Sequence, residues 1–132
     1  MNKETGSTAP HKIKNFTDII AWQEAHTLVL MIYRITKKFP KEELFSLVDQ
    51  MRRCIISVSS NIAEGFGRQS YREKIQFYSI AQGSVAELQS QLYAGKDLGY
   101  VSAGDFGVAY EQSIKVNKLV NGLIKGARLI SA

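Results

Sequence analysis

The sequence predicts an all-α protein, folded as an antiparallel, up-down-up-down four-helix bundle. Apolar residues recur at alternating steps of three and four in four long stretches, as they do on one face of an α-helix. Only Pro10 and Pro40 interrupt the 132 residues, and a scarcity of proline favours uninterrupted helices. The links between the stretches are a few residues long, and short links make consecutive helices antiparallel neighbours.

The first predicted helix runs from Thr17 to Lys38, with Thr17 or Asp18 as N-cap and Pro40 beyond its end. The second runs from Lys41 to Gly65. Their predicted core stripes are Trp22, Ala25, Val29, Ile32, Thr36 and Phe39 in the first, and Leu44, Val48, Met51, Ile55, Val58 and Ile62 in the second.

The third predicted helix opens with Ser70 and Glu73 in the spacing of a capping box and closes at Gly99. The fourth follows the weaker box of Ser102 and Asp105. Their predicted stripes are Tyr78, Ala81, Val85, Leu88, Leu92 and Gly95, and Phe106, Ala109, Ser113, Val116, Val120, Leu123, Ala127 and Ile130.

Composition limits the domain organisation and the compartment. We expect a flexible N-terminal segment over residues 1–15 and one bundle over 16–132. Neither a signal peptide nor a run of about 20 apolar residues is found, so no membrane partner is expected. The single Cys54 excludes an internal disulfide and suits the cytoplasm.

The outward faces of the second and third helices carry few charges, although water-facing helices are normally rich in Lys and Glu. Between Ile75 and Gly95 the only charged residue is Glu87, and none lies between Cys54 and Ala63. A helix that is apolar or small nearly all round is usually buried, which predicts a homo-oligomer; the alternative is an indifferent surface of Ser and Gly. The predicted interface comprises Ile56, Ser57, Ser60, Asn61, Glu64, Ile80, Gly83, Ser84, Glu87 and Gln91.

Basic residues suggest a second kind of partner. The formal net charge of +5 permits contact with RNA or DNA without requiring it, and the fourth helix has no acid after Glu111. Its basic face is explained either by solubility or by phosphate binding. The candidate nucleic-acid contacts are Arg52, Arg53, Arg68, Arg72, Lys74, Lys115, Lys118 and Lys125.

Several chemistries are excluded by the residues present. Neither His11 nor His26 follows a Glu by three residues, as the di-iron sites of helix bundles require. There is no phosphate-binding G-x-x-x-x-G-K-[ST] loop, and Cys54 is interpreted as a packing thiol. One polar cluster could serve either as an active site or as structural hydrogen bonding, and we favour the structural role: Asn61, Glu64, Arg68, Ser84, Glu87 and Gln91. No enzyme, metal or cofactor is therefore expected.

Several ordered motifs carry a family resemblance. They are Trp22-Gln23 with Ala25, Phe39-Pro40 with Glu43, Arg52-Arg53, the run from Ser57 to Gly65, Gly67-Arg68 with Ser70, Phe77, the run from Ile80 to Ser84, Glu87-Leu88, and Gln91-Leu92. Over about residues 15–125 the chain resembles the bacterial four helix bundle proteins, also called 23S rRNA intervening-sequence proteins.

This resemblance implies a small cytoplasmic bundle that forms a ring-like homopentamer and has no established enzymatic activity. The weakly charged outer faces of the second and third helices, together with the missing catalytic groups, separately suggest a scaffold or adaptor that binds another protein. The family is also similar in shape to the accessory protein of diversity-generating retroelements, a basic pentamer that binds nucleic acid. One departure is that Ser59 or its neighbour stands where family members often have Pro, which implies a straighter second helix here.

Overall fold

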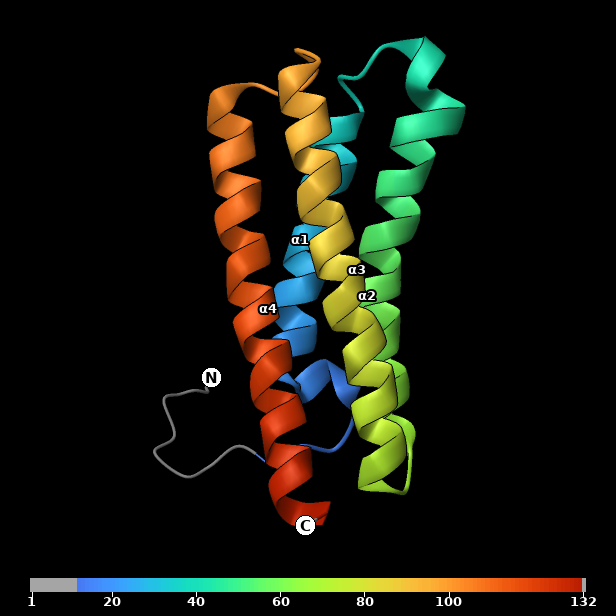
Figure 1. The fold of residues 1–132 in the computed structure, drawn as a ribbon, viewed down its shortest axis with the longest axis vertical. Coiled ribbons are helices and arrows are strands. Elements are labelled where there is room, and N and C mark those ends of the chain that lie inside the picture. Colours follow the sequence, from blue (N-terminus) through green and yellow to red (C-terminus); the bar gives the residue numbers. More distant parts are fainter. Residues whose placement is uncertain (1–11, 132) are drawn as a thin grey trace.

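The computed structural model describes residues 12–131 and consists of four long helices, with no strand in that part of the chain (Figure 1). These helices are α1 (Ile20–Thr36), α2 (Asp49–Gly67), α3 (Tyr71–Asp97) and α4 (Ala103–Ser131). The all-α prediction is confirmed. Most of the predicted flexible segment, residues 1–11, lies outside the described residues. Within 12–131, no helix is both long and apolar enough to cross a membrane.

Each helix packs against two others. The chain turns back at each connection, so that α2 and α4 both run from the upper to the lower end in Figure 1. The packed pairs are α1 with α2, α2 with α3, α3 with α4, and α4 with α1. Helices α2 and α4 therefore lie diagonally across the bundle, and their outward faces point to opposite sides of the molecule.

One apolar core fills the space between the helices. All six predicted positions of the third stripe are buried, as are five of the six in each of the first two stripes. Trp22 is only half-buried. Removing this apolar surface from water is the main force that holds the helices together, at about 25 cal/mol per Å².

The predicted stripe of the fourth helix is wrong at its end. Ile124 is buried in place of Leu123, which is half-buried, and Ile130 is 61% exposed. Phe106 is also half-buried. An ideal α-helix drifts by about 20° per heptad from a strict 3.5-residue repeat, so the inward position moves on by one residue along a helix of this length. The last turn then extends past the core.

The helix starts follow side-chain caps. Asn15, rather than Thr17 or Asp18, caps a short 3₁₀ helix, η1 (Phe16–Asp18), through a reciprocal box with Asp18. The predicted caps of α3 and α4 are present, because Ser70 Oγ accepts the Glu73 N–H at 3.1 Å and Ser102 Oγ accepts the Asp105 N–H at 3.1 Å.

The start of the second predicted helix differs from an ordinary α-helix. A 3₁₀ turn, η2 (Lys41–Glu43), leads into a π-helical turn, η3 (Leu44–Val48), before α2 begins. A π turn closes i→i+5 hydrogen bonds and so inserts a residue into the helical repeat. This shifts the facing of its side chains, and Leu44, predicted to be in the core, is 47% exposed.

Two glycines satisfy real structural demands. Gly65, predicted as a helix stop, lies inside α2, and a Cβ there would come within 2.5 Å of Tyr78 Cε1. Its missing side chain therefore lets α2 and α3 approach closely. Gly99, with φ of 83°, adopts the left-handed conformation that ends α3.

Candidate assembly surface

The outward edge of α2 and its preceding π turn forms an exposed ridge. We call it the α2 edge, and its residues are Phe45, Arg53, Ile56, Ser60, Glu64 and Gly67, all exposed. Steps of three and four residues from Arg53 onward keep these positions on one side of the helix. The ring of Phe45 at its upper end is 91% exposed, although a phenyl ring gains free energy from burial.

The π turn that presents Phe45 is held by a hydrogen-bonded carboxylate. Glu43 accepts Ser46 Oγ–H at 2.7 Å and the Tyr100 hydroxyl at 3.2 Å. The Ser46 hydrogen bond is the largest effect on Glu43 and lowers the pKa of its carboxyl. This link between the turn and the end of α3 fixes Phe45 in its outward position.

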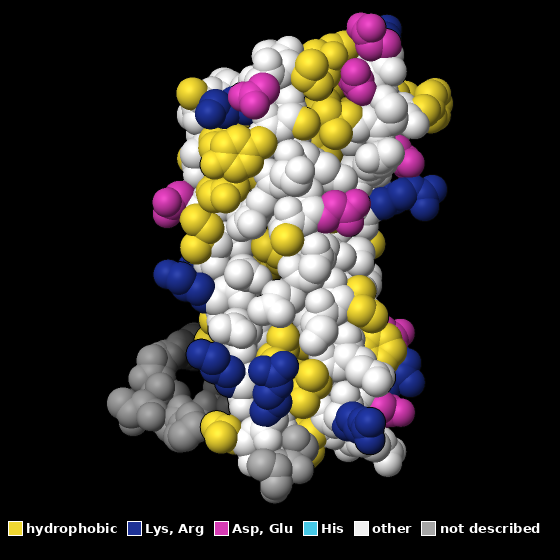
Figure 2. Space-filling view, in the orientation of Figure 1, with side chains coloured by type: hydrophobic (Ala, Val, Ile, Leu, Met, Phe, Trp, Pro, Cys, Tyr) yellow, Lys and Arg dark blue, Asp and Glu magenta, His cyan; other side chains and the backbone are white. Residues whose placement is uncertain are grey.

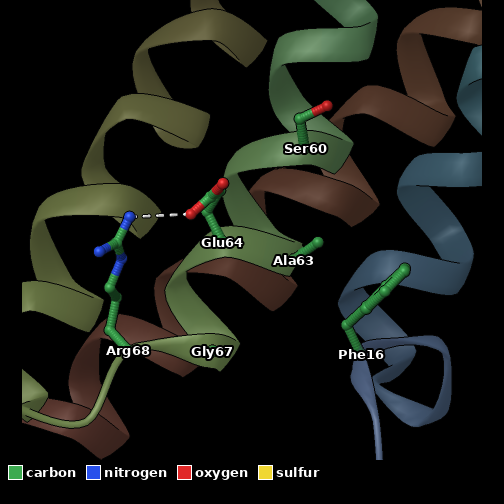
Figure 3. Close-up of a pocket in the computed structure, with 6 residues that line it drawn as sticks. All are labelled: Phe16, Ser60, Ala63, Glu64, Gly67 and Arg68. Carbon is green, nitrogen blue, oxygen red and sulfur yellow. Dashed lines mark hydrogen bonds and ion pairs between the residues drawn. The ribbon is translucent and has the colours of Figure 1, made fainter.

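The lower end of the α2 edge borders an open hollow of about 590 Å³ (Figure 3). Phe16 faces it from η1, across Ala63 and Gly67 of α2, while Glu64 and Arg68 lie on the side toward α3. Arg68 Nη2 and Glu64 Oε2 form an ion pair at 2.9 Å. The hollow thus combines an apolar wall with one charged rim.

The predicted polar cluster is divided by the structure. Ser57 Oγ and Ser84 Oγ are 3.0 Å apart, and Asn61 Nδ2 donates to the Ser57 carbonyl at 2.8 Å. These bonds tie α2 to α3 and brace α2 itself. Glu87 and Ser84 border a crevice of about 240 Å³ beside Ser57.

Gln91, the last member of the predicted polar cluster, is buried. Its residue is only 9% exposed, and its Oε1 atom has no hydrogen-bond partner. A buried polar atom without a partner costs free energy. Gln91 therefore lies within the subunit rather than on its surface, unlike the predicted interface residues Ile56, Ser60, Glu64, Ile80, Gly83 and Glu87, which are exposed.

Cys54 has the environment of a packing thiol. It is 5% exposed, and its Sγ–H donates to the Ser84 carbonyl at 3.0 Å. Burial, together with the nearby Glu87 carboxylate, raises the pKa of the thiol to about 12. A nucleophilic cysteine needs a lowered pKa, so this geometry disfavours covalent chemistry.

His26 and the possible metal ligands lie apart from one another in the described part of the chain. His26 stacks on Trp22 with ring centroids 4.8 Å apart, away from the serines and Cys54 on α2 and α3. Among residues 12–131, no group of three or more His, Cys, Asp or Glu side chains is placed to hold a metal ion.

Most of the candidate nucleic-acid cations on α2 have partners within the chain. Arg52 Nε donates to Thr36 Oγ1 at 2.9 Å while its guanidinium lies over the Tyr33 ring. Arg53 pairs with Asp49 at 3.0 Å. These two arginines support α2 and its contact with α1.

Lys74 has a structural position as well. Its Nζ donates to the Phe66 carbonyl at 2.7 Å and the Gly65 carbonyl at 3.3 Å, which are among the unpaired carbonyls at the end of α2. Burial lowers the pKa of this ammonium group. Lys74 therefore caps the C-terminal end of α2, and its ammonium group is engaged by backbone carbonyls of the same chain.

The remaining candidate cations lie along α4 from its middle downward and at the start of α3. Lys115 pairs with Glu24 at 3.3 Å, whereas Arg72, Lys118 and Lys125 are exposed and make no ion pair within the described residues. Figure 2 shows Lys and Arg side chains over the lower half of α4, with acidic side chains mainly in the upper half of this face. The lower end thus offers fixed positive charge to an anionic partner.

The structure also reveals a surface that the sequence patterns did not indicate. A groove runs between α1 and α4 near the upper end, with lobes of about 220 Å³ and 480 Å³ that share Met31 and Val108. Arg34 and Lys38 border one lobe, and Gly107 widens the other. The groove forms only where α1 packs against α4, and the sequence of one helix does not show which helix lies beside it. The one local sign of the groove in the sequence was the apolar Val108 among the outward positions of α4.

Comparisons with known proteins agree with this arrangement. The family model of the 23S rRNA-intervening sequence protein matches residues 17–122, which include all of α1, α2 and α3 and most of α4. The chain belongs to this family. The resemblance expected from the motifs on α2 and α3 is therefore confirmed.

A solved structure of this kind has the same fold. A protein of unknown function from the S23 ribosomal protein family of Bacteroides thetaiotaomicron VPI-5482 aligns with a TM-score of 0.75 and 23% sequence identity. The alignment covers 82% of the present chain and 97% of that chain. No curated protein matches the chain. For this intervening-sequence protein, function must therefore be argued from its surface.

Proposed function

We propose that the chain is one subunit of a non-enzymatic homopentamer, built from up-down-up-down bundles, that acts in the cytoplasm as a scaffold or adaptor for another protein. The observation that carries this proposal is the exposure of three large apolar side chains: Phe45 on η3, Ile56 on α2 and Ile80 on α3. The core is complete without them, and side chains of this size gain free energy when a partner covers them. The number five follows the family resemblance.

The proposed lack of enzymatic activity and the proposed cytoplasmic location each have a supporting observation. The raised pKa of Cys54 and the stacking of His26 on Trp22 support a non-catalytic role. A lone, unpaired thiol supports a reducing compartment.

Gel filtration coupled to light scattering tests the assembly. We expect a molar mass of about five times the 14.8 kDa of one chain. A monomer at micromolar concentration contradicts the proposal. Phe45→Ala combined with Ile56→Ala should lower the molar mass toward that of one chain. The control pair Lys37→Ala with Lys41→Ala changes two exposed residues at the upper end that are not among these apolar side chains, and it should leave the molar mass unchanged.

A second candidate function, RNA or DNA binding, is favoured by the exposed cations Arg72, Lys118 and Lys125, which make no ion pair within the described residues. Phosphate contacts release counterions, so affinity must fall with salt. We expect binding to an RNA oligonucleotide to weaken roughly tenfold or more between 50 and 200 mM salt for about three contacts. Binding that is undetectable at low salt, or independent of salt, contradicts this function.

A matched set of variants separates specific from general charge effects. Replacing Arg72, Lys118 and Lys125 by Gln should remove the salt-dependent binding. Replacing Lys37, Lys41 and Lys96 by Gln removes the same charge from exposed positions elsewhere and should preserve most of it. Equal losses in the two sets indicate that only net charge matters.

A further inference from the structure

We propose that the α2 edge of one copy of this chain docks lengthwise on the outward face of α4 in the next copy. The α4 face consists of Val108, Glu111, Lys118, Gly122, Lys125 and Leu129, all exposed. This inference rests on the proposed oligomer and specifies its contact. It requires neighbouring copies to stand side by side with their bundles pointing the same way.

Hydrogen bonds within the bundle establish which residues of α2 and α4 lie at the same height. Ser57 is level with Ser84, because their hydroxyls are 3.0 Å apart. On α3, Ser84 lies between Gln82, which contacts Asn121, and Gln89, which donates to Ser113 Oγ at 2.9 Å. The level of Ser57 and Ser84 on α4 is therefore near Lys118.

The same register brings opposite charges together. Because α2 and α4 run in the same direction (Figure 1), Glu64, two turns below Ser57, is level with Lys125, two turns below Lys118. Arg53, one turn above Ser57, comes within a turn of Glu111. Arg53 already pairs with Asp49, and Glu64 with Arg68. Their side chains nevertheless remain 79% and 57% exposed, so each can also reach a neighbour.

The upper ends of the two faces have complementary shapes. Counting upward from Ser57 places Phe45 near Gly107 and Val108, which line the larger lobe of the α1–α4 groove. Met31 forms its apolar floor, and a Cβ at Gly107 would have no neighbour within 4 Å. An exposed phenyl ring thus lies at the height of an open groove on the opposite side of the bundle. The lining of this groove combines Met31 and Val108 with the polar residues Glu111, Gln112 and Lys115.

At the lower ends of the two faces the roles of projecting side chain and cavity are exchanged. Leu129 of α4 is 80% exposed, and the register places it beside Gly67. Gly67 borders the hollow whose apolar wall is formed by Phe16 and Ala63 (Figure 3). Here α4 supplies the projecting side chain and α2 supplies the cavity.

Contact between two different faces of identical chains has a further consequence. Because the α2 edge and the α4 face are different surfaces on opposite sides, each copy offers both, and the contact is head-to-tail. Because the two faces point to opposite sides, repetition of such a contact closes a ring only when each copy is also rotated relative to the one before it. Without that rotation it gives an open filament. A second copy is therefore the occupant that matches charge, shape and height together.

Disulfide trapping tests this contact. Ser60 and Gly122 lie at the same height, on diagonally opposed helices of one chain, so a disulfide between Ser60→Cys and Gly122→Cys must join two copies. We expect mild oxidation of the double variant to give a covalent ladder of several chains on non-reducing gels. Mixing the two single variants should give covalent dimers only.

Two controls limit the interpretation. The unaltered chain should give no ladder, because Cys54 is buried. Gly83→Cys with Gly122→Cys should give no ladder either, because Gly83 has the same height on α3 but belongs to another exposed face. A ladder from this control pair, or none from the first pair in a protein that light scattering shows to be assembled, overturns the proposed contact and leaves the oligomer standing. A monomeric protein overturns both.

Charge reversal provides an independent check at the level of Glu64. Glu64→Lys should raise the dissociation constant of the assembly by about tenfold, as expected for a close interfacial charge pair. Adding Lys125→Glu should restore most of the affinity. Loss of the Glu64–Arg68 ion pair alone cannot explain such a rescue, so failure of the second reversal to restore assembly contradicts the contact.

Discussion

At the residue scale, the closest approach between α2 and α3 depends on the missing side chain of Gly65. Tyr78 occupies the space that a Cβ would need, and its ring is 4% exposed and packed within the core. The ring therefore has little freedom to move aside.

Gly65→Ala should accordingly destabilise the protein by about 1–3 kcal/mol, the usual cost of overpacking. Gly83→Ala on α3 is the matched control, because its Cβ meets nothing within 4 Å and alanine is the better helix former by about 1 kcal/mol. Urea unfolding at one protein concentration compares the two. Equal stabilities of the two variants contradict the assigned role of Gly65.

The thiol of Cys54 makes stability depend on pH. Its pKa is about 12 in the folded chain against 9.0 for an ordinary thiol. Between these values the unfolded chain loses a proton that the folded chain retains, so the free energy of unfolding falls as pH rises above about 9.

Urea unfolding at pH 8 and pH 10 measures this effect. Cys54→Ser removes the titrating thiol and should lose less stability over that interval than the unaltered chain. Iodoacetamide should also alkylate Cys54 much more slowly in the folded protein than in urea at pH 8. Equal alkylation rates in the two states would show that the thiol is accessible.

At the element scale, the helical repeat predicted the first three core stripes almost completely. Met51, Ile55 and Val58 are buried as predicted, because steps of three and four hold wherever the helix is regular. The predicted burial of Leu44 is wrong because the π turn breaks that repeat. The predicted burial of Ile130 is wrong because small angular errors accumulate along α4.

The candidate surface could be predicted only in part, for a related reason. Exposed positions such as Ile80 and Gly83 follow from the repeat of one helix, so sequence alone identified them. Phe45 depends on the π turn, and the groove at Met31 depends on pairing α1 with α4. Neither property is encoded in the periodicity of a single helix.

Phe45 offers a test of the π turn as a contact element. Because its ring is 91% exposed, Phe45→Ala should change the stability of an isolated subunit by no more than about 0.5 kcal/mol. Assembly should nevertheless weaken by about tenfold or more if the ring is buried between copies. Ile55→Ala, in the core, should instead cost about 2–5 kcal/mol of folding stability.

Comparing unfolding with the dissociation constant of the assembly separates the two effects. A Phe45 variant that unfolds more easily while assembling normally contradicts the proposed role of the turn.

At the scale of the whole molecule, the charge of α4 has two competing explanations. Lys118 and Lys125 either face phosphates or face the α2 edge of another copy. If the head-to-tail contact forms, these two lysines are covered, and the positive charge left for nucleic acid is mainly that of Arg72 and other residues outside the contact. Assembly and phosphate binding by Lys118 and Lys125 should therefore exclude each other.

The proposed function and the proposed contact both require an assembled oligomer rather than a free bundle. Native mass spectrometry of the purified protein measures its stoichiometry and any bound nucleic acid together. We predict one dominant species with the mass of five chains of 14.8 kDa and no added mass. A dominant single chain would contradict the assembly, and a single chain that carries nucleic acid would favour the second function.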